Sequence, residues 1–129
     1  MSSIFTKIIN REIPAYIVAE DDNYLAFLDV SPLQKGHTLV IPKNETDFIF
    51  DVNDDELSGL IVFAKQVAKK INAAFECNRV GMTVIGLEVP HAHIHLIPIN
   101  KMEDMMFNSP KLMLTKEVFL EIQTKIVNQ

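Results

Sequence analysis

Short runs of apolar and β-branched residues predict five strands along this chain. They cover residues 14–20, 24–29, 36–42, 80–85 and 91–98. Asp21, Asp22 and Asn23 stand between the first two runs, and such residues favour turns because their side chains bond to nearby backbone groups. We therefore expect the first two strands to pair as a hairpin.

Between the third and fourth strands, an apolar repeat at helical spacing predicts one long helix. Asn53 is placed to cap its first turn, and Glu56 fits the third helical position of a capping box. The expected core stripe contains Leu57, Leu60, Ile61, Ala64, Ala68, Ile71 and Phe75, with Phe63, Val67 and Ala74 widening it on one side. So broad an apolar arc predicts either deep burial within one chain or a subunit interface.

Two shorter helices are predicted near the ends of the chain. Ser2 or Ser3 can cap the first, whose apolar residues are Ile4, Phe5, Ile8 and Ile9. Thr115 can cap the last, whose apolar face holds Val118, Phe119, Ile122 and Ile126. We expect the last helix to dock on the body of the protein or on a partner subunit.

The composition describes a single domain spanning residues 1–129, with 48% hydrophobic and 22% charged residues. No apolar run approaches the roughly 20 residues of a membrane helix and no signal peptide is evident, so a cytoplasmic location without membrane contact is expected. The single cysteine, Cys77, cannot form an intrachain disulfide, which fits a reducing compartment. A net charge of −5 argues against a nucleic-acid partner, because such a surface needs a basic stripe.

Three of the four histidines occupy alternate positions, namely His91, His93 and His95. On a strand, alternate side chains share one face, so the three imidazoles would line up over roughly 13 Å. The apolar residues between them would share the opposite face and pack on a core. Pro90 and Pro98 bracket the run, where a missing N–H does least harm.

Three interpretations of this histidine run stay open from the residues alone. The simplest is a solvated strand with its polar side chains outward. The second is a transition-metal site, because imidazole is a common ligand; only Cys77 and His37 remain as further ligands. The third is nucleophilic or acid–base chemistry on an anionic group, in which one imidazole attacks phosphorus and the others hold phosphate oxygens or a leaving group.

Residues 91–97, HAHIHLI, resemble the signature of the histidine triad (HIT) family. Residues 29–43, DVSPLQKGHTLVIPK, and residues 3–14, SIFTKIINREIP, are similar to two earlier segments of the same family, and the likeness is closest to its Hint-like branch. The resemblance implies an α+β fold, a HIT-like five-stranded antiparallel sheet with one long helix and short terminal helices. The signature-bearing part would end near residue 100, leaving a C-terminal extension with a helix.

The resemblance also implies an enzyme acting on nucleotides. His93 would attack the α-phosphorus and form a nucleotidyl-histidine that water then hydrolyses. His91 and His95 would orient His93 and bind phosphate oxygens or the leaving group, while His37 would build the polar side of the site. Nucleoside phosphoramidates are the expected substrates and a homodimer the expected assembly, as in the Hint-like branch. The scheme requires no metal or other cofactor.

The same resemblance assigns residues to a purine nucleotide. Phe5, Ile8, Phe27 and Val30 would contact the base. Asp29 ends the second predicted strand, where a carboxylate on its own is solvated or caps a turn. By resemblance, Asp29 would instead accept hydrogen bonds from the two ribose hydroxyls.

The chain departs from the family at two places. Bacterial relatives carry a Cys-x-x-Cys and a later histidine that help to bind zinc, and the matching positions here are Ser3, Thr6 and Glu45. Because hydroxyls are poor zinc ligands, we expect the structural zinc to be absent. The link before the histidines is short and places Glu88 at the nucleotide site, where a carboxylate would repel phosphate unless it is protonated or turned away. Glu88 would otherwise bind a cationic leaving group or pair with His91.

These departures keep two alternatives to the enzyme open. One is a nucleotide-binding regulatory protein with little catalysis, and the other is a transition-metal-binding protein that uses the three histidines. Met102, Met105, Met106 and Phe107 follow the last strand. They are expected to fill gaps in the packing, or to line the leaving-group side of the site.

Overall fold

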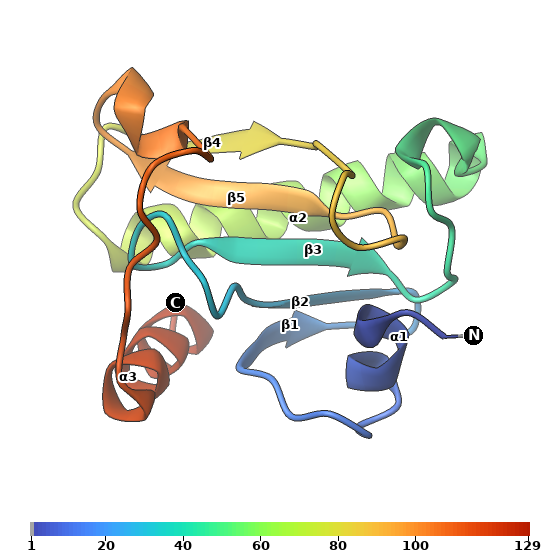
Figure 1. Cartoon of the computed structure of the whole chain (residues 1–129), viewed down its shortest axis with the longest axis horizontal. Helices are drawn as coiled ribbons and strands as arrows, with labels where there is room; N and C mark the ends of the chain where they lie inside the picture. The colour runs from blue at the N-terminus through green and yellow to red at the C-terminus, as the bar shows by residue number, and fades with distance from the viewer. Residues whose placement is uncertain (1) are drawn as a thin grey trace.

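A computed structural model of the protein describes residues 2–129. Its elements are α1 (Ile4–Ile9), β1 (Ile17–Glu20), β2 (Tyr24–Leu28), β3 (Thr38–Pro42), α2 (Asp54–Ala74), β4 (Arg79–Thr83), β5 (Ile94–Ile99) and α3 (Lys116–Val127). Short 3₁₀ turns lie at Ile49–Asp51 and Met102–Met105. The five strands form one antiparallel sheet in the order β1-β2-β3-β5-β4 (Figure 1). The predicted α+β fold with a five-stranded antiparallel sheet is confirmed.

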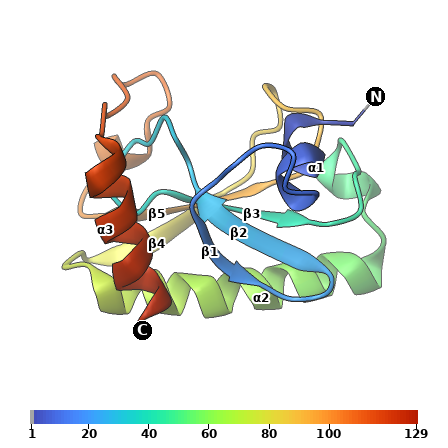
Figure 2. The same cartoon turned by 90° about the horizontal axis from the view of Figure 1, so that it is seen from below.

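The sheet has two differently covered faces. Helix α2 runs along one face, and α1 lies with several loops on the other (Figure 2). Alternate strand residues divide between the two sides: Ala26 and Val40 join the core under α2, whereas Phe27 and Leu39 join a second apolar cluster with α1. The second cluster consists of Phe5, Ile8, Leu25, Phe27, Leu39 and Ile41. The face away from α2 is therefore the one on which loops and side chains are free to build a site.

The predicted helix caps are confirmed by their hydrogen bonds. Ser3 Oγ accepts from Thr6 N at 3.0 Å, and Thr115 Oγ1 accepts from Val118 N at 3.2 Å. Asn53 Oδ1 likewise accepts from the backbone N–H of the third residue of α2, at 2.9 Å. Each cap satisfies a backbone donor that a helix start leaves unpaired.

Two predictions about α2 were wrong in detail. The carboxylate of Glu56 does not close a capping box, because it accepts from Asn44 Nδ2 at 2.8 Å. Ile61 is 43% exposed and lies outside the core, whereas Phe63 and Val67 are buried in it. The buried stripe of α2 is thus rotated toward Phe63 and Val67, the side on which the apolar arc widens. Packing within one chain therefore explains why that side of the helix is apolar.

Helix α3 docks on the body of the same chain. Phe119, Ile122 and Ile126 are buried in the core under α2. The ring of Tyr16 stacks on that of Phe119 with centroids 4.9 Å apart, and Gln123 Nε2 donates to Ile17 O at 2.9 Å. The helix thereby lies beside β1, while β4 forms the other edge of the sheet. Across residues 2–129, no helix is long and apolar enough to cross a membrane.

The strand that was predicted from His91 to Pro98 begins only at Ile94. Two other hydrogen bonds hold the preceding residues in place of strand pairing: the side-chain Nε2 of His91 lies 2.8 Å from Pro42 O at the end of β3, and Ala92 N donates to a loop carbonyl, that of Thr46, at 2.6 Å. Pro98 lies inside β5, at a point where the pairing with β3 has already ended. The missing N–H of a proline is tolerated there.

Candidate active site

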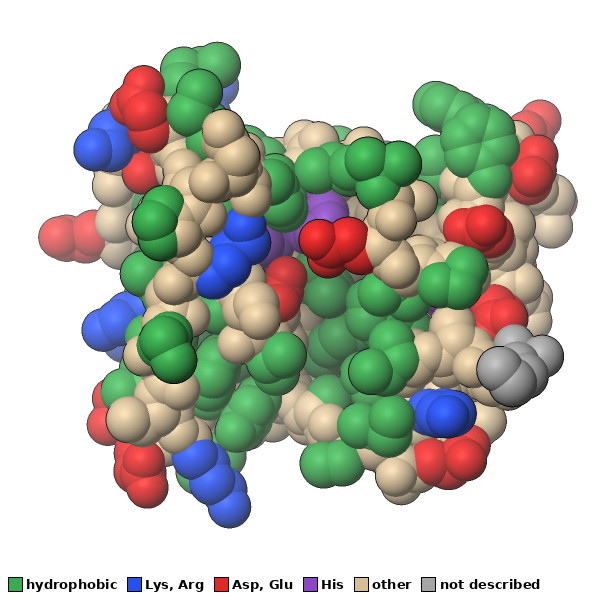
Figure 3. Space-filling model, viewed as in Figure 1, with side chains coloured by type: hydrophobic (Ala, Val, Ile, Leu, Met, Phe, Trp, Pro, Cys, Tyr) green, Lys and Arg blue, Asp and Glu red, His purple; other side chains and the backbone are tan. Residues whose placement is uncertain are grey.

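The histidines border a cavity of about 430 Å³ on the face away from α2. Figure 3 shows histidine side chains at the bottom of a hollow between acidic and basic groups. The cavity is lined by Asp29, Ser31, Ile85, Gly86, Leu87, Glu88, His93, His95, Phe107 and Lys111. A larger groove of about 690 Å³ runs beside α3 and includes none of the histidines. The smaller cavity is therefore the candidate active site.

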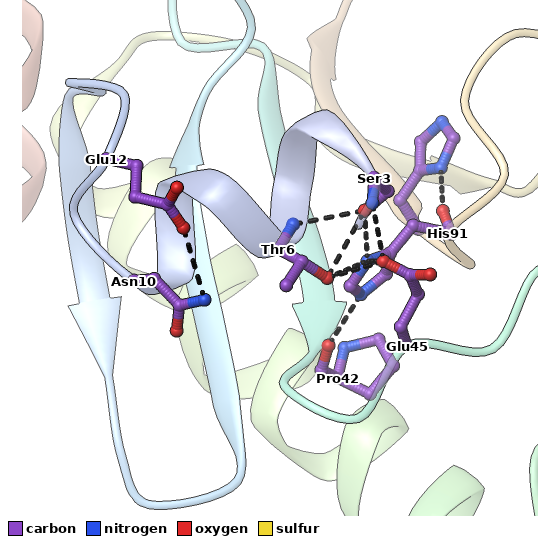
Figure 4. A network of polar contacts seen from close by, with 8 residues as sticks. Ser3, Thr6, Asn10, Glu12, Pro42, Glu45 and His91 are labelled. Atoms are coloured by element: carbon purple, nitrogen blue, oxygen red, sulfur yellow. Dashed lines mark hydrogen bonds and ion pairs between the residues drawn. The ribbon is translucent and has the colours of Figure 1, made fainter. Parts of the chain in front are cut away.

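His91 lies behind this cavity with no exposed surface. Its Nε2 is 2.8 Å from Pro42 O, and because a carbonyl only accepts, Nε2 carries the proton. The neutral ring then accepts at Nδ1 from Ser3 Oγ, at 2.8 Å. The network that holds the ring is drawn in Figure 4. Since both ring nitrogens are occupied, the ring is placed to orient its neighbours and not to contact a phosphate oxygen.

The proton on His93 is assigned by the same argument. His93 Nδ1 lies 2.8 Å from the carbonyl oxygen of His91, so Nδ1 donates and carries the hydrogen. In the neutral ring, Nε2 then keeps its lone pair. An attacking imidazole needs such a backbone acceptor on its other nitrogen. His91 thus orients His93 through its backbone, while its own side chain is held by Ser3 and Pro42.

His37 and His95 form a second chain of hydrogen bonds. The N–H of Leu33 donates to His37 Nδ1 at 3.0 Å, so the proton of the neutral His37 ring is on Nε2. That nitrogen lies 3.0 Å from His95 Nδ1 and donates to it. The neutral His95 ring must then carry its proton on Nε2.

Two ring nitrogens of opposite character reach the cavity. Among the residues described, every buried side-chain nitrogen or oxygen has a partner. His93 Nε2 and His95 Nε2 have no hydrogen-bond partner among these residues, so they are not among the buried atoms. Both nitrogens are therefore open to the cavity that their rings line. The rings are neighbours, with centroids 4.9 Å apart. The site therefore presents a lone pair on His93 beside an N–H donor on His95.

Burial keeps the supporting histidines neutral. It lowers the pKa of His37 to about 3, and the nearby charges of His95, Lys111 and His93 act in the same direction. Burial, with a smaller effect of His93, lowers the pKa of His95 to about 4. Both rings are therefore uncharged at neutral pH, and the donor that faces the cavity is a neutral imidazole N–H.

Asp29 lies at the cavity wall and also caps a turn. Its Oδ1 accepts from Ser31 N at 2.8 Å, and its Oδ2 is 3.5 Å from His37 Nε2. Burial raises the pKa of this carboxyl group, and the hydrogen bond from Ser31 opposes the rise. The carboxylate lines the cavity and keeps acceptor capacity for further donors.

None of the four residues expected around the base lines the cavity. Phe5, Ile8 and Phe27 are buried in the apolar cluster of α1, with the Phe5 ring edge-on to His93 at a centroid distance of 5.1 Å. Val30 is 67% exposed and is not part of the cavity lining. The structure thus places the apolar cluster next to His93 and outside the cavity lining.

Ser3, Thr6 and Glu45 converge on His91, as Figure 4 shows. Glu45 Oε1 accepts from Ser3 N at 2.6 Å and from Thr6 Oγ1 at 2.7 Å, and it lies 4.0 Å from His91 Nδ1. These hydrogen bonds, that of Thr6 first and that of Ser3 second, lower the pKa of Glu45 to about 2. Two hydroxyls and a carboxylate that is already hydrogen-bonded do not fit a structural zinc site. The idea that Glu88 pairs with His91 is wrong, because Ser3 and Glu45 occupy that side of the ring.

Ser3 should contribute to stability through both of its contacts. Replacing it by alanine removes the cap of α1 and leaves His91 Nδ1 only the more distant hydroxyl of Thr6, at 3.4 Å, which already donates to Glu45. We expect Ser3→Ala to lower the free energy of unfolding by about 1–3 kcal/mol. Urea unfolding measures this loss, with the exposed neighbour Ser2→Ala as the matched control. Equal stabilities of the two variants would contradict the assigned network.

A metal ion at the histidines fits less well than a hydrogen-bonded cluster. One ligand atom each of Asp29, His37 and His95 lies within 4.8 Å of the others. Binding through His37 Nε2 would require a lone pair there, and the proton would have to move to Nδ1. Nδ1 already accepts from the N–H of Leu33, so two hydrogens would face each other. That the chemistry needs no metal stays a prediction.

Lys111, Phe107 and Ser31 also line the cavity. Of these, only Phe107 was considered from the sequence, as part of the segment after the last strand. Its ring packs edge-on against His95, with centroids 4.7 Å apart. Lys111 stands between Pro110 and the short apolar run 112–114, outside any motif, so no sequence signal marked it.

Comparison with known proteins gives relatives in sequence and neighbours in fold. The model of the HIT domain family matches residues 10–102. An uncharacterised HIT-like protein of Methanocaldococcus jannaschii is 46% identical over 99 residues, which cover 74% of this chain and 77% of that protein. The adenosine 5′-monophosphoramidase hnt1 of Schizosaccharomyces pombe is 35% identical over 99 residues, covering 76% of this chain and 74% of the enzyme. The crystal structure of a HIT-like protein from Bartonella henselae aligns with a TM-score of 0.85 at 30% identity, covering 98% of this chain and 95% of that one.

Proposed function

The chain belongs to the HIT family, and from this premise we propose that it hydrolyses or transfers the nucleotidyl group of a purine nucleoside phosphoramidate or a related conjugate. The observation that carries the proposal is the 2.8 Å contact of His93 Nδ1 with the carbonyl oxygen of His91, which assigns the tautomer of His93. Its Nδ1–H is tied to the carbonyl of His91, and its Nε2 lone pair opens into the cavity. The similarity to an adenosine 5′-monophosphoramidase supports a phosphoramidate as the substrate.

In the proposed reaction, His93 Nε2 attacks the α-phosphorus. A phosphorus–Nε2 bond forms, and the bond from phosphorus to the leaving nitrogen breaks with its electron pair on that nitrogen. The leaving nitrogen takes a proton from solvent through the open cavity. Water then attacks the same phosphorus, loses a proton to solvent and releases the nucleoside monophosphate, so that His93 regains its lone pair.

The neighbouring residues prepare and stabilise this step. The Nε2–H of His95 is placed to donate to a phosphoryl oxygen, and such a fixed donor is most effective where water is excluded. His37 holds His95 in the tautomer that leaves this N–H free. Asp29 supplies the acceptor for the ribose hydroxyls, and Phe5 leads into the apolar cluster proposed for the base.

The proposed activity is tested with two substrates that contain the same nucleotide. The protein is incubated with adenosine 5′-phosphoramidate and with diadenosine triphosphate, and the release of AMP is followed by chromatography. We expect faster release from the phosphoramidate. Release of AMP from the dinucleotide alone would mean that the substrates are dinucleoside polyphosphates and not phosphoramidates. No release from either compound would contradict the enzymatic proposal.

A second candidate is a nucleotide-binding regulatory protein with little catalysis, and Glu88 favours it. This carboxylate lines the cavity beside the histidines, where it opposes the approach of an anion. Calorimetric AMP binding, combined with no AMP release from any conjugate, would support this candidate. The third candidate, a metal-binding protein, predicts stoichiometric metal in protein purified without an affinity tag.

We also infer that two copies pair through the β4 edge. Edge strands with exposed apolar side chains are prone to pair with another chain, and a second copy satisfies two-fold symmetry. Met82 on β4 is 55% exposed, and Val84 and Ile85 after it border a recess shared with Phe48 and Phe50. These large exposed side chains form an apolar surface of the kind that subunit interfaces cover.

A charge on that edge should separate the subunits. We expect Met82→Lys to raise the dimer dissociation constant by about 100-fold, because an unpaired ammonium would be buried at the interface. Sedimentation velocity measures the change. Met113→Lys is the matched control, since Met113 is 97% exposed and is not part of the recess that Val84 and Ile85 border. A wild-type protein that stays monomeric at high concentration would contradict the pairing.

A further inference from the structure

The segment after β5 returns to the histidine face and brings Phe107 and Lys111 into the cavity lining. The Leu112 N–H donates to Pro32 O at 2.8 Å, which fastens the segment to the loop that follows β2. The Phe107 ring lies edge-on to His95, with centroids 4.7 Å apart. Lys111 therefore has a defined place in the wall of the site, although it comes from the part of the chain beyond the family signature.

A series of side-chain contacts leads from the apolar cluster through the histidines to Lys111. The Phe5 ring lies 5.1 Å from that of His93, and the His93 ring lies 4.9 Å from that of His95. The His95 ring in turn contacts Phe107, and Lys111 Nζ lies 5.7 Å from the centroid of Phe107. With the base toward Phe5 and the α-phosphorus at His93, as proposed above, the part of the cavity at Phe107 and Lys111 is left for the leaving group.

Lys111 is the only lysine or arginine in the cavity lining, which also contains the carboxylates of Asp29 and Glu88. Its Nζ donates to the backbone carbonyls of Phe107 and Ser109. An ammonium has three hydrogens, so one remains for a further acceptor. Within residues 2–129, Lys111 forms no ion pair with a carboxylate. The cavity thus holds one positive charge with a free hydrogen, and this charge also opposes the rise that burial causes in the pKa of Asp29.

We propose that Lys111 binds an anionic group, a carboxylate or a phosphate, on the leaving group of the substrate. The proposal rests on the nucleotide hydrolysis proposed above and adds the chemical class of the leaving group. The ring of Phe107 contacts both the His95 ring and the Lys111 ammonium, so Lys111 lies one side chain away from the histidines. Without Lys111, an anionic leaving group would meet only the two carboxylates of the lining and be repelled.

The test uses three adenosine 5′-phosphoramidates that differ only in the charge of the leaving amine. The amines are glycine with a carboxylate, aminomethylphosphonate with a phosphate-like group, and neutral glycinamide. We expect Lys111→Met to lower kcat/KM roughly tenfold for the anionic conjugate that the protein prefers, and less than about twofold for glycinamide. Lys111→Arg should retain most of the preference. Lys116→Met, a nearby exposed lysine outside the cavity, serves as the control.

The outcomes separate the two proposals. Activity of wild type on the glycinamide conjugate supports the proposed hydrolysis whatever Lys111 does. Equal losses on all three conjugates, or no loss on any, would overturn the assignment of Lys111 to the leaving group. If wild type hydrolyses none of the three conjugates, their binding to the His93→Ala variant is measured by calorimetry. Tighter binding of the anionic conjugates that is lost when Lys111→Met is added supports the subsite. Equal affinities for all three conjugates overturn it.

Discussion

Replacing His93 by alanine should lower kcat for AMP release by about 10⁴-fold or more, because the variant has no nucleophile where His93 Nε2 opens into the cavity. His93 is 5% exposed and its main structural contact is the hydrogen bond to His91 O, so the fold should persist. Steady-state kinetics with adenosine 5′-phosphoramidate measure the loss.

The matched control for this variant is His93→Gln, which fills the space and can still donate to the carbonyl of His91. We expect it to be as inactive as His93→Ala, while AMP binding by calorimetry stays within about threefold of wild type for both. Circular dichroism checks that both variants fold. Turnover by either variant at a rate near that of wild type would remove His93 from the chemistry.

Lowering the pH should destabilise the protein already at pH values well above those at which most carboxylates titrate. The unfolded chain protonates histidines near pH 6.5, whereas burial lowers the pKa of His37 to about 3 and that of His95 to about 4. A group with a depressed folded-state pKa contributes stability above its unfolded pKa and loses it as the pH falls. Each such histidine changes the free energy of unfolding by about 1.4 kcal/mol per pH unit, so the two together approach about 3 kcal/mol per unit below pH 6.

Urea unfolding at several pH values between 7.5 and 5 measures this slope. His37→Gln is the informative variant, because a glutamine can accept from Leu33 N–H and donate to His95 without titrating. We expect the free energy of unfolding of this variant to change less with pH than that of wild type. The difference in slope should be about 1.4 kcal/mol per pH unit, the contribution of one histidine. A wild-type stability that is constant from pH 7.5 to 5 would contradict the neutral buried pair.

Features with local signals could be predicted from the sequence. Asp21 forms the expected turn, accepting from Asn23 N and Tyr24 N at 2.8 Å each. The caps at Asn53 and Thr115 depend on residues within one helical turn, and both were predicted. The HIT signature also led correctly to the sheet and its long helix, since a motif of this kind carries information about the whole fold.

Features decided by distant contacts could not be predicted. The alternation of His91, His93 and His95 suggests one continuous strand, but the strand begins after His93 because the His91 side chain bonds to Pro42, which is distant in sequence. The carboxylate of Glu56 is likewise taken by Asn44. Each of these bonds forms only once the sheet and its loops have come together.

The candidate site shows the same division. The triad histidines, His37 and Asp29 were marked by motif, whereas the protonation of each ring became assignable only from its partners in space. Lys111 had no signal, because its place in the cavity depends on how the C-terminal segment returns to the loop after β2. Charged residues outside motifs acquire their roles from such packing.

The most direct test of the proposed chemistry is to trap the nucleotidyl group on the protein. Wild-type protein is mixed with a stoichiometric amount of adenosine 5′-phosphoramidate and quenched in base within milliseconds to seconds, since phosphorus–nitrogen bonds of this kind are labile in acid. Peptide mass spectrometry then locates the adduct. An adenylyl group on the peptide at His93, formed and lost as fast as AMP appears, is the predicted result. AMP release with no adduct at any time, or with the adduct on another residue, would contradict it.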